Sequence, residues 1–234
     1  MRTVLTIIFS TILVYSSHKI TTIPEASGIS YCKDTNTLMV ANDEGTLYEI
    51  TPKGEILLKH KLGNYDLEGV VCLKKEVILT IEGGSLLIVN RKSLKIKKLK
   101  IRGKGVKFRK KLGIEGIAKI GKLYYLTIQA KKRKKRANIL VVKLNSNSAD
   151  IIDIINHQII DSAGMEYHNN KLYIVSDKKD KLYIYDYKKN RVLKKVKLDK
   201  FAQEGITFDR DNNVYLADDN GAIFKYSKRE LKIK

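Results

Sequence analysis

Acidic residues recur at one position of a short segment that the chain repeats. Glu68, Glu115 and Glu204 each stand directly before a glycine, whereas Ser27 and Ala163 occupy that position in the other two segments. The five segments read EASGI (25–29), DLEGV (66–70), GIEGI (113–117), DSAGM (161–165) and AQEGI (202–206). Carboxylates at equivalent positions of a repeat are expected to meet at one place in the fold, where they can bind a cation or a polar ligand.

A second set of polar residues ends an apolar run within each repeat. The set consists of Asp43, Glu82, Gln129, Asp177 and Asp219. Two consecutive antiparallel strands place the start of the first beside the end of the second, so both sets face the same end of the fold. Converging carboxylates repel one another unless a cation, a proton or a polar substrate compensates them. Oxygen donors without clustered His or Cys favour Ca2+; the alternative is a water-filled channel with solvated acids.

The elements that position these residues are strands. The repeat glycines are about 41 to 48 residues apart, which fits a four-stranded propeller blade. Each segment leads into an apolar strand such as 206–208, a polar turn and a second strand such as 214–217. A third, alternating strand such as 182–186 and a more polar fourth strand such as 192–198 follow. The sequence predicts an all-β fold, a five-bladed β-propeller of four-stranded antiparallel blades. An N-terminal strand within 18–23 is expected to pair with the last blade and close the ring.

The N-terminus resembles a secretory signal. Arg2 supplies a positive charge, residues 4–14 are almost uninterruptedly apolar, and Ser16 and Ser17 are small residues suited to cleavage. The sequence therefore predicts a signal peptide over 1–17, with an uncleaved anchor as the alternative, and a single β-propeller domain over 18–234. Such a protein is exported to the periplasm or the cell envelope, with peripheral association with the plasma membrane as one form.

Cys32 and Cys72 are the two cysteines of the chain. The repeat alignment puts them one strand position apart in neighbouring blades, on opposite strand faces. An exported protein can join such a pair, but this spacing favours two buried free thiols.

Positive charge is concentrated between Arg91 and Arg136, where Glu115 is the single acidic residue, in a chain of formal net charge +21. The run Lys131, Lys132, Arg133, Lys134, Lys135, Arg136 follows Gln129 and is expected on the rim of the acidic face. A basic rim around a cation suits an anionic ligand such as a phosphate, a polysaccharide or a lipid head group. The alternative is a general decoration of outer strands and loops with lysine. Export and the lack of a known binding motif make nucleic acid an unfavoured partner.

The strings EASGI, DLEGV, GIEGI, AGMEY, LYIVSD, EGITFD and VYLADD occur in register with the repeats. Together they resemble the SdiA-regulated domain family, also called YjiK-like, over nearly all of the chain after the signal. The resemblance implies a β-propeller, export, association with the cell envelope and Ca2+ on the channel axis, without an established enzymatic activity. By the same resemblance, the metal ligands are expected to be Glu68, Glu115, Glu204 and Asp177.

Two classes of function fit these patterns. The first is a monomeric, non-catalytic module that binds a ligand or an envelope component on the metal-bearing face. It is favoured because no Gly-x-Ser-x-Gly elbow and no local histidine motif is present. The second is a Ca2+-dependent hydrolase of lactones or phosphoesters, in which the metal polarises the substrate and a neighbouring carboxylate acts as base or nucleophile.

Overall fold

The computed structural model describes residues 18–104, 106, 108, 113–130, 132 and 134–233. The predicted signal peptide, residues 1–17, lies outside the described residues. The described chain is built from β-strands and two short 3-10 helices, in agreement with the predicted all-β class. Among these residues, no helix has the length and apolar character that a membrane-spanning segment requires.

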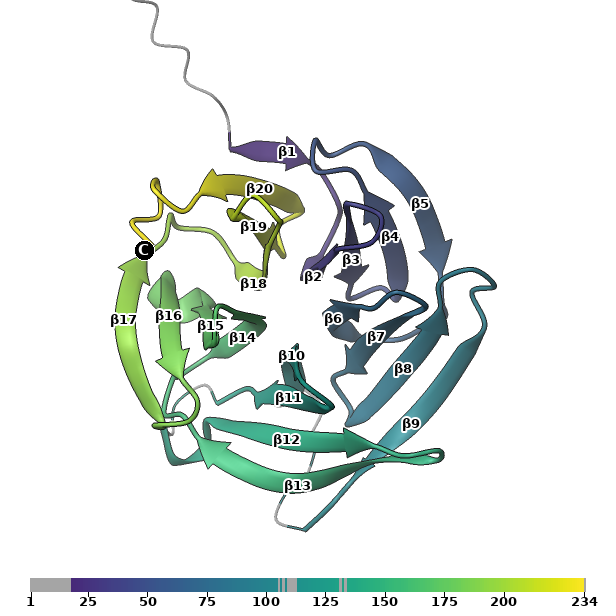
Figure 1. The fold of residues 1–234 in the computed structure, drawn as a ribbon, viewed down its shortest axis with the longest axis vertical. Helices are drawn as coiled ribbons and strands as arrows, with labels where there is room; N and C mark the ends of the chain where they lie inside the picture. Colours follow the sequence, from purple (N-terminus) through teal and green to yellow (C-terminus); the bar gives the residue numbers. More distant parts are fainter. Residues whose placement is uncertain are drawn as a thin grey trace, which may run out of the picture.

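The strands form antiparallel groups of four that follow the repeats of the sequence. Figure 1 shows them arranged around a common centre, with the first strand of each group nearest to it. The first two groups are β2 (Ala26–Cys32), β3 (Thr37–Asn42), β4 (Thr46–Ile50), β5 (Ile56–Lys61) and β6 (Leu67–Cys72), β7 (Glu76–Ile81), β8 (Ser85–Asn90), β9 (Ile96–Arg102). The next two are β10 (Ile114–Ile120), β11 (Leu123–Ile128), β12 (Asn138–Leu144), β13 (Ser148–Asn156) and β14 (Ser162–His168), β15 (Lys171–Ser176), β16 (Lys181–Asp186), β17 (Arg191–Lys197).

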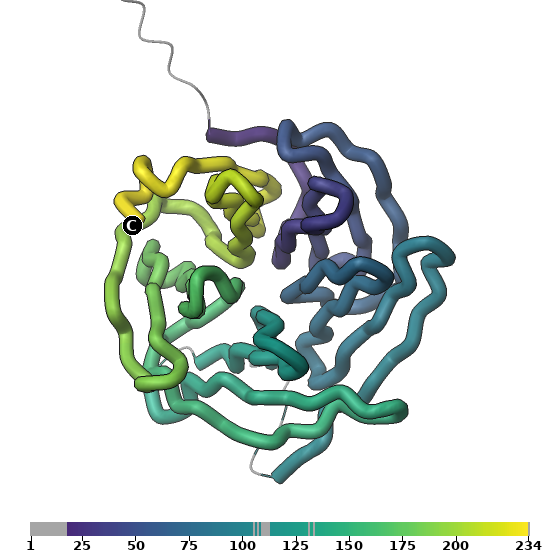
Figure 2. Tube along the Cα trace, in the orientation of Figure 1, coloured from purple at the N-terminus to yellow at the C-terminus, as the bar shows by residue number. Residues whose placement is uncertain are grey.

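The last group joins the two ends of the chain. It contains β18 (Gln203–Phe208), β19 (Asn213–Asp218), β20 (Ala222–Ser227) and, as its outer strand, β1 (Lys19–Thr21). Figure 2 shows this N-terminal strand beside the C-terminal strands. The predicted pairing of the segment 18–23 with the last repeat is therefore confirmed: Lys19 lies opposite Phe224 and Thr21 opposite Ile223.

One feature of the sheets differs from separate four-stranded units. Residues Ser148–Asp150 of β13 pair in parallel with Lys100–Arg102 of β9, so the second and third groups form one eight-stranded sheet. Strand β13 has nine residues, and its first three lie beside the end of the neighbouring outer strand. The pairing satisfies backbone groups that an outer edge would otherwise leave open.

Burial falls from the centre outwards. Every residue of β2 is buried, whereas β17 is exposed at most of its positions. The inner strands are covered on both faces because neighbouring sheets pack face to face. For example, Met39 and Ala41 of the first sheet pack with Val70 and Leu79 of the second. The lysines of β17 are therefore solvated, as the more polar composition of the fourth strand predicts.

The repeat glycines allow neighbouring first strands to approach closely. A Cβ at Gly28 would lie 2.2 Å from the carbonyl oxygen of Glu68 in the next sheet. A Cβ at Gly205, in the last sheet, would lie 2.9 Å from the backbone nitrogen of Ile29 in the first. Only a residue without a side chain fits at such contacts.

The prediction of two free thiols is wrong. Cys32 and Cys72 form a disulfide, with Cα atoms 5.3 Å apart. The two residues end β2 and β6, which pack side by side in different sheets. Alternation of faces governs neighbours within one sheet, and it does not separate side chains that point into the space between two sheets. The Cα separation lies within the range that a disulfide requires.

Candidate metal centre

A β-bulge places the acidic residue of the repeat. In β6, Glu68 and Gly69 together oppose the single residue Thr80 of β7, because the register shifts between Leu67 and Val70. The Thr80 hydroxyl accepts a hydrogen bond from the Gly69 amide at 2.7 Å. A bulge redirects side chains relative to a regular strand, and corresponding shifts occur at the start of all five first strands.

In two of the five groups, the residue opposite the bulge is a threonine that also ties the first strand to the next group. The Thr80 hydroxyl lies 3.1 Å from the carbonyl oxygen of Glu115, to which it donates. Thr127 repeats the arrangement: it accepts from the Gly116 amide at 2.7 Å and donates to the carbonyl of Ala163 at 2.9 Å. These buried threonines hold the backbone that carries the acidic side chains, so the carboxylates are positioned by rigid elements.

The acidic residues of the first polar set and all members of the second except Asp177 meet in one cavity of about 240 Å³ at the start of the first strands. Strand pairing brings them together as expected, since Leu67 at the start of β6 lies opposite Ile81 at the end of β7. No Lys or Arg is among the described residues that line it, which are Asp43, Asp66, Glu68, Glu82, Glu115, Gln129, Glu204 and Asp219.

Burial and mutual repulsion raise the pKa of several of these carboxyl groups and thereby favour their neutral form. Burial, with the charges of Glu115 and Asp43, raises the pKa of Glu68 well above its usual value. Burial and the neighbouring Asp219 and Asp66 raise the pKa of Asp43 to about 7. Burial and the Glu115 charge also raise the pKa of Glu204. A bound cation would relieve this accumulated unfavourable charge.

Three carboxylates have the spacing of a metal site. Asp43, Asp66 and Glu68 each offer an oxygen, and these oxygens lie within 4.8 Å of one another. Ligands at 2.3–2.6 Å from Ca2+ fit that separation. The Asp43 Oδ1 atom is buried and has no hydrogen-bond partner among the described residues. Glu68 is buried and Asp66 is exposed, so the site lies between the interior and solvent. A buried acceptor without a partner is costly, and a cation would satisfy it.

The structure brings together most of the predicted site residues. Glu68, Glu115 and Glu204, predicted as metal ligands, line the cavity. With them lie four of the ten residues predicted to bind a ligand, Asp43, Glu82, Gln129 and Asp219, which belong to the second polar set.

Asp177 is not one of the described residues that line this cavity. The chain leaves β15 at Ser176 and enters the 3-10 helix Asp177–Lys179. Asp177 is still close enough for its charge to contribute to the raised pKa of Glu204.

Asp66 is the cavity residue that sequence reasoning missed. It begins the segment DLEGV, two residues before Glu68, and Glu25 and Asp161 begin their own segments in the same way. This third acidic position of the repeat is the sequence signal that could have identified Asp66. It was less visible because the equivalent residues are Gly113 and Ala202 in the other two segments.

The basic run follows β11, in the predicted loop between the second and third strands. Lys134–Arg136 form a short 3-10 helix, and all three residues are exposed, as is Lys132. The Asn156 side chain donates hydrogen bonds of 3.0 Å to the carbonyls of Lys134 and Ala137, which attaches the loop to β13. The predicted positions Lys131 and Arg133 lie outside the described residues.

Comparison with known proteins gives a family and a fold. The model of the family described as SdiA-regulated matches residues 12–226. The crystal structure of glutaminyl cyclase from Myxococcus xanthus is similar, with a TM-score of 0.68 and 10% identity. The match covers 88% of this chain and 91% of that chain, and it shows that the two share the β-propeller fold. The search of curated proteins gives no match.

Proposed function

Since the chain belongs to the SdiA-regulated family, we propose that it is an exported, envelope-associated propeller that binds Ca2+ in its acidic cavity. The metal then presents a non-catalytic binding face to an anionic partner. The observation that carries the proposal is the group Asp43, Asp66 and Glu68, whose oxygens lie within 4.8 Å of one another.

The framework of this proposal is one closed, five-bladed domain over 18–234. Its support is the succession of contacts between first strands, in which β18 packs against β2 as β2 packs against β6. The Tyr31 amide donates to the Thr207 hydroxyl at 3.0 Å, across the first and last sheets. Tyr215 and Ile223 of the last sheet share a buried cluster with Ile29 and Val40 of the first. Closure removes exposed sheet edges.

The choice of Ca2+ follows from the donor atoms. The described lining offers carboxylate and amide oxygens, without His or Cys. Hard cations with several oxygen ligands suit such a set, and Ca2+ tolerates the irregular geometry that donors from different strands provide. Glu115, Glu204 and Asp219 line the same cavity, and a bound ion would also reduce the repulsion between their charges and the three-carboxylate group.

The place of action is inferred from the disulfide and from the basic loop. Disulfides persist in oxidising compartments such as the periplasm or the cell exterior, and Cys32–Cys72 is such a bond. The exposed Lys132, Lys134, Lys135 and Arg136 form a basic rim suited to anionic envelope components, including membrane head groups, bound by a monomer. Substitution of residues 131–136 by serine should abolish binding to anionic vesicles at low salt; undiminished binding contradicts this part of the proposal.

Thermal unfolding tests the metal site. We expect saturating Ca2+, relative to EDTA, to raise the Tm of the mature protein by roughly 5–10 °C, because occupancy at 100 times Kd stabilises by about 2.7 kcal/mol. Asp66→Asn and Glu68→Gln should each remove most of this difference. Glu55→Gln, at an exposed acid outside the cavity, is the matched control and should retain it. An absent Ca2+ response, or one unchanged by both cavity variants, refutes the proposal.

The Ca2+-dependent hydrolase stays a prediction. Its measurement is turnover of lactones, aryl esters and phosphate esters with Ca2+ and with EDTA. Activity that requires Ca2+ and disappears in Glu115→Ala would establish it, and turnover equal to that of the variant would exclude these substrates.

A further inference from the structure

A second cavity, of about 370 Å³, lies at the opposite end of the first strands. Its residues come from the ends of β2, β6, β10, β14 and β18, whereas the acidic cavity lies at their starts. Between the two, the repeat glycines and the residues after them leave a space of only about 10 Å³. The second cavity is therefore separate from the candidate metal centre, and its volume falls within the usual range for small-molecule sites.

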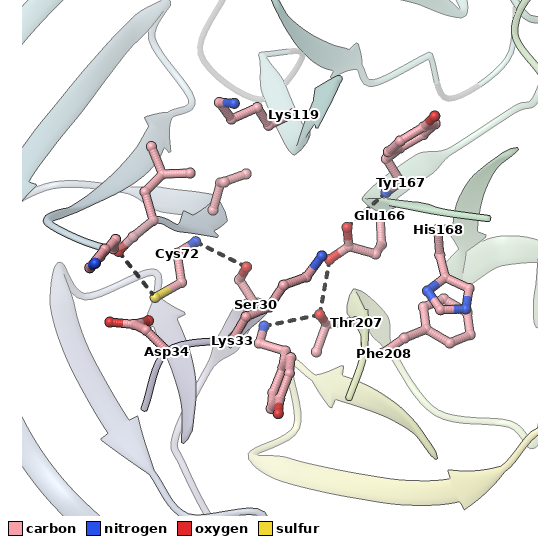
Figure 3. A pocket seen from close by; sticks show the side chains of 14 residues that line it. Ser30, Lys33, Asp34, Cys72, Lys119, Glu166, Tyr167, His168, Thr207 and Phe208 are labelled. Carbon is pink, nitrogen blue, oxygen red and sulfur yellow. Dashed lines mark hydrogen bonds between the residues drawn. The ribbon is translucent and has the colours of Figure 1, made fainter. Parts of the chain in front are cut away.

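The charges of this cavity have both signs. Glu166 comes from β14, Lys119 from β10 and Lys33 from the turn after β2 (Figure 3). Lys74, from the turn after β6, also lines the cavity. The other acidic residue of the lining, Asp34, forms an ion pair with Arg91, which does not line the cavity. Arg91 Nη1 donates to both carboxylate oxygens of Asp34 at 2.8 Å. The lysines therefore retain an excess of positive charge that a carboxylate can balance.

Glu166 is held in place by two hydrogen bonds. Its Oε2 accepts from the Thr207 hydroxyl at 2.9 Å, and its Oε1 accepts from the Tyr167 amide at 2.8 Å. Figure 3 shows the carboxylate among the cavity side chains. Burial raises the pKa of Glu166 to about 7, and the Lys33 charge opposes this only in part. No Lys or Arg of the described chain lies within 4.0 Å of its oxygens. Lys33 is therefore a charged neighbour of Glu166 but forms no ion pair with it, and a ligand ammonium would supply one.

The rest of the wall offers apolar surface. Tyr31, Val71, Leu73 and Phe208 line the cavity. The His168 ring stacks on Phe208 with centroids 4.2 Å apart, which fixes the orientation of that aromatic side. A small pocket with an apolar wall and a few convergent polar groups is the usual form of a specific ligand site.

We propose that this cavity binds a small zwitterion with an apolar side group, of the free amino acid type. Glu166 receives the ammonium group, Lys33 and Lys119 receive the carboxylate, and the apolar side group packs against Tyr31 and Phe208. This arrangement balances both kinds of charge in the cavity. An anion without an ammonium would approach Glu166 unfavourably, and a simple amine would approach the lysines unfavourably.

Three probes with one aromatic body test the proposal by calorimetric titration of the mature protein: L-phenylalanine, 3-phenylpropionate and 2-phenylethylamine. We expect L-phenylalanine to bind at least about tenfold more tightly than either singly charged probe, since each charge-assisted contact contributes a factor of this order. The preference should be the same with Ca2+ and with EDTA, because the acidic cavity is not involved.

Variants assign the contacts. Glu166→Gln should remove the preference for L-phenylalanine over 3-phenylpropionate, and the double variant Lys33→Gln, Lys119→Gln should remove the preference over 2-phenylethylamine. Lys200→Gln, at an exposed lysine outside both cavities, is the control and should change neither. The lysine variants alter solvent-accessible side chains and keep the test valid even if Glu166→Gln unfolds. The proposal is overturned if L-phenylalanine shows no saturable binding or no preference over the singly charged probes. It is also overturned if the preference over 2-phenylethylamine survives in the lysine double variant.

Discussion

The buried histidine His157 should make the protein lose stability in mild acid. Its side chain is 4% exposed, and its ring contacts Tyr185 edge to face at a centroid distance of 6.3 Å. Nδ1 accepts from the Ile159 amide at 3.2 Å, while Nε2 has no partner among the described residues. Burial lowers the pKa of His157 from 6.5 to about 4. Protonation of the folded protein is therefore unfavourable relative to the unfolded chain.

The sign and size follow from linkage. A depressed histidine pKa gives a contribution that is fully present above the unfolded value of 6.5 and is lost as the pH falls towards 4. At about 1.4 kcal/mol per pKa unit, the full loss is about 3 kcal/mol, and about 2 kcal/mol is already lost at pH 5. For a chain of this size, that corresponds to a fall in Tm of about 4–8 °C.

The assay compares wild type with His157→Gln by denaturant and thermal unfolding at pH 8 and pH 5 in EDTA. Glutamine does not titrate and can still accept from the Ile159 amide, so the difference between the two proteins should shrink by about 2 kcal/mol from pH 8 to pH 5. His60→Gln, on the outer strand β5, controls for the removal of a histidine elsewhere. Parallel pH profiles of wild type and His157→Gln would refute the reasoning.

Three further perturbations test the acidic cavity, the disulfide and the sheet packing. Burial raises the pKa of Asp43 to about 7, so the contribution of this carboxyl group to stability is lost as the pH rises through that value. Asp43→Asn should therefore stabilise the metal-free protein at pH 8 by roughly 1–2 kcal/mol in denaturant unfolding, after allowance for partial exposure. The same variant should abolish the increase in stability that Ca2+ causes. Replacing both Cys32 and Cys72 by serine should cost about 4 kcal/mol, given their separation of 40 residues, and a loss below about 1 kcal/mol by urea unfolding would contradict this. Gly28→Ala should cost more than about 3 kcal/mol because its Cβ would meet the Glu68 carbonyl oxygen at 2.2 Å, whereas Gly83→Ala, with no atom within 4 Å, should change the unfolding midpoint little; equal effects would argue against the close strand approach.

The sequence by itself determined the strands and the two polar registers. Strand order follows from alternation and turn residues, which are local properties. The convergence of Glu68 with Glu82 follows from antiparallel pairing of consecutive strands, because a short turn fixes which ends lie together. The repeat then places equivalent residues around one centre, so the acidic cavity was predictable before its geometry was known.

Only the tertiary structure decided which residues from different repeats touch. The Cys32–Cys72 disulfide depends on how closely β2 and β6 pack across two sheets, and face alternation within a strand carries no information about that distance. The inclusion of Asp66 with Asp43, and the exclusion of Asp177 from the same cavity, depend on bulges and on a 3-10 turn at the strand ends.

The second cavity shows the same limit most clearly. Lys33, Lys119 and Glu166 have no common spacing and belong to three different repeats. They meet because the strands that carry or precede them all end at one side of the molecule, and the raised pKa of Glu166 arises from its burial there. Sequence periodicity reports the pairing of neighbouring strands, whereas burial and contacts between sheets arise only when the whole chain has packed.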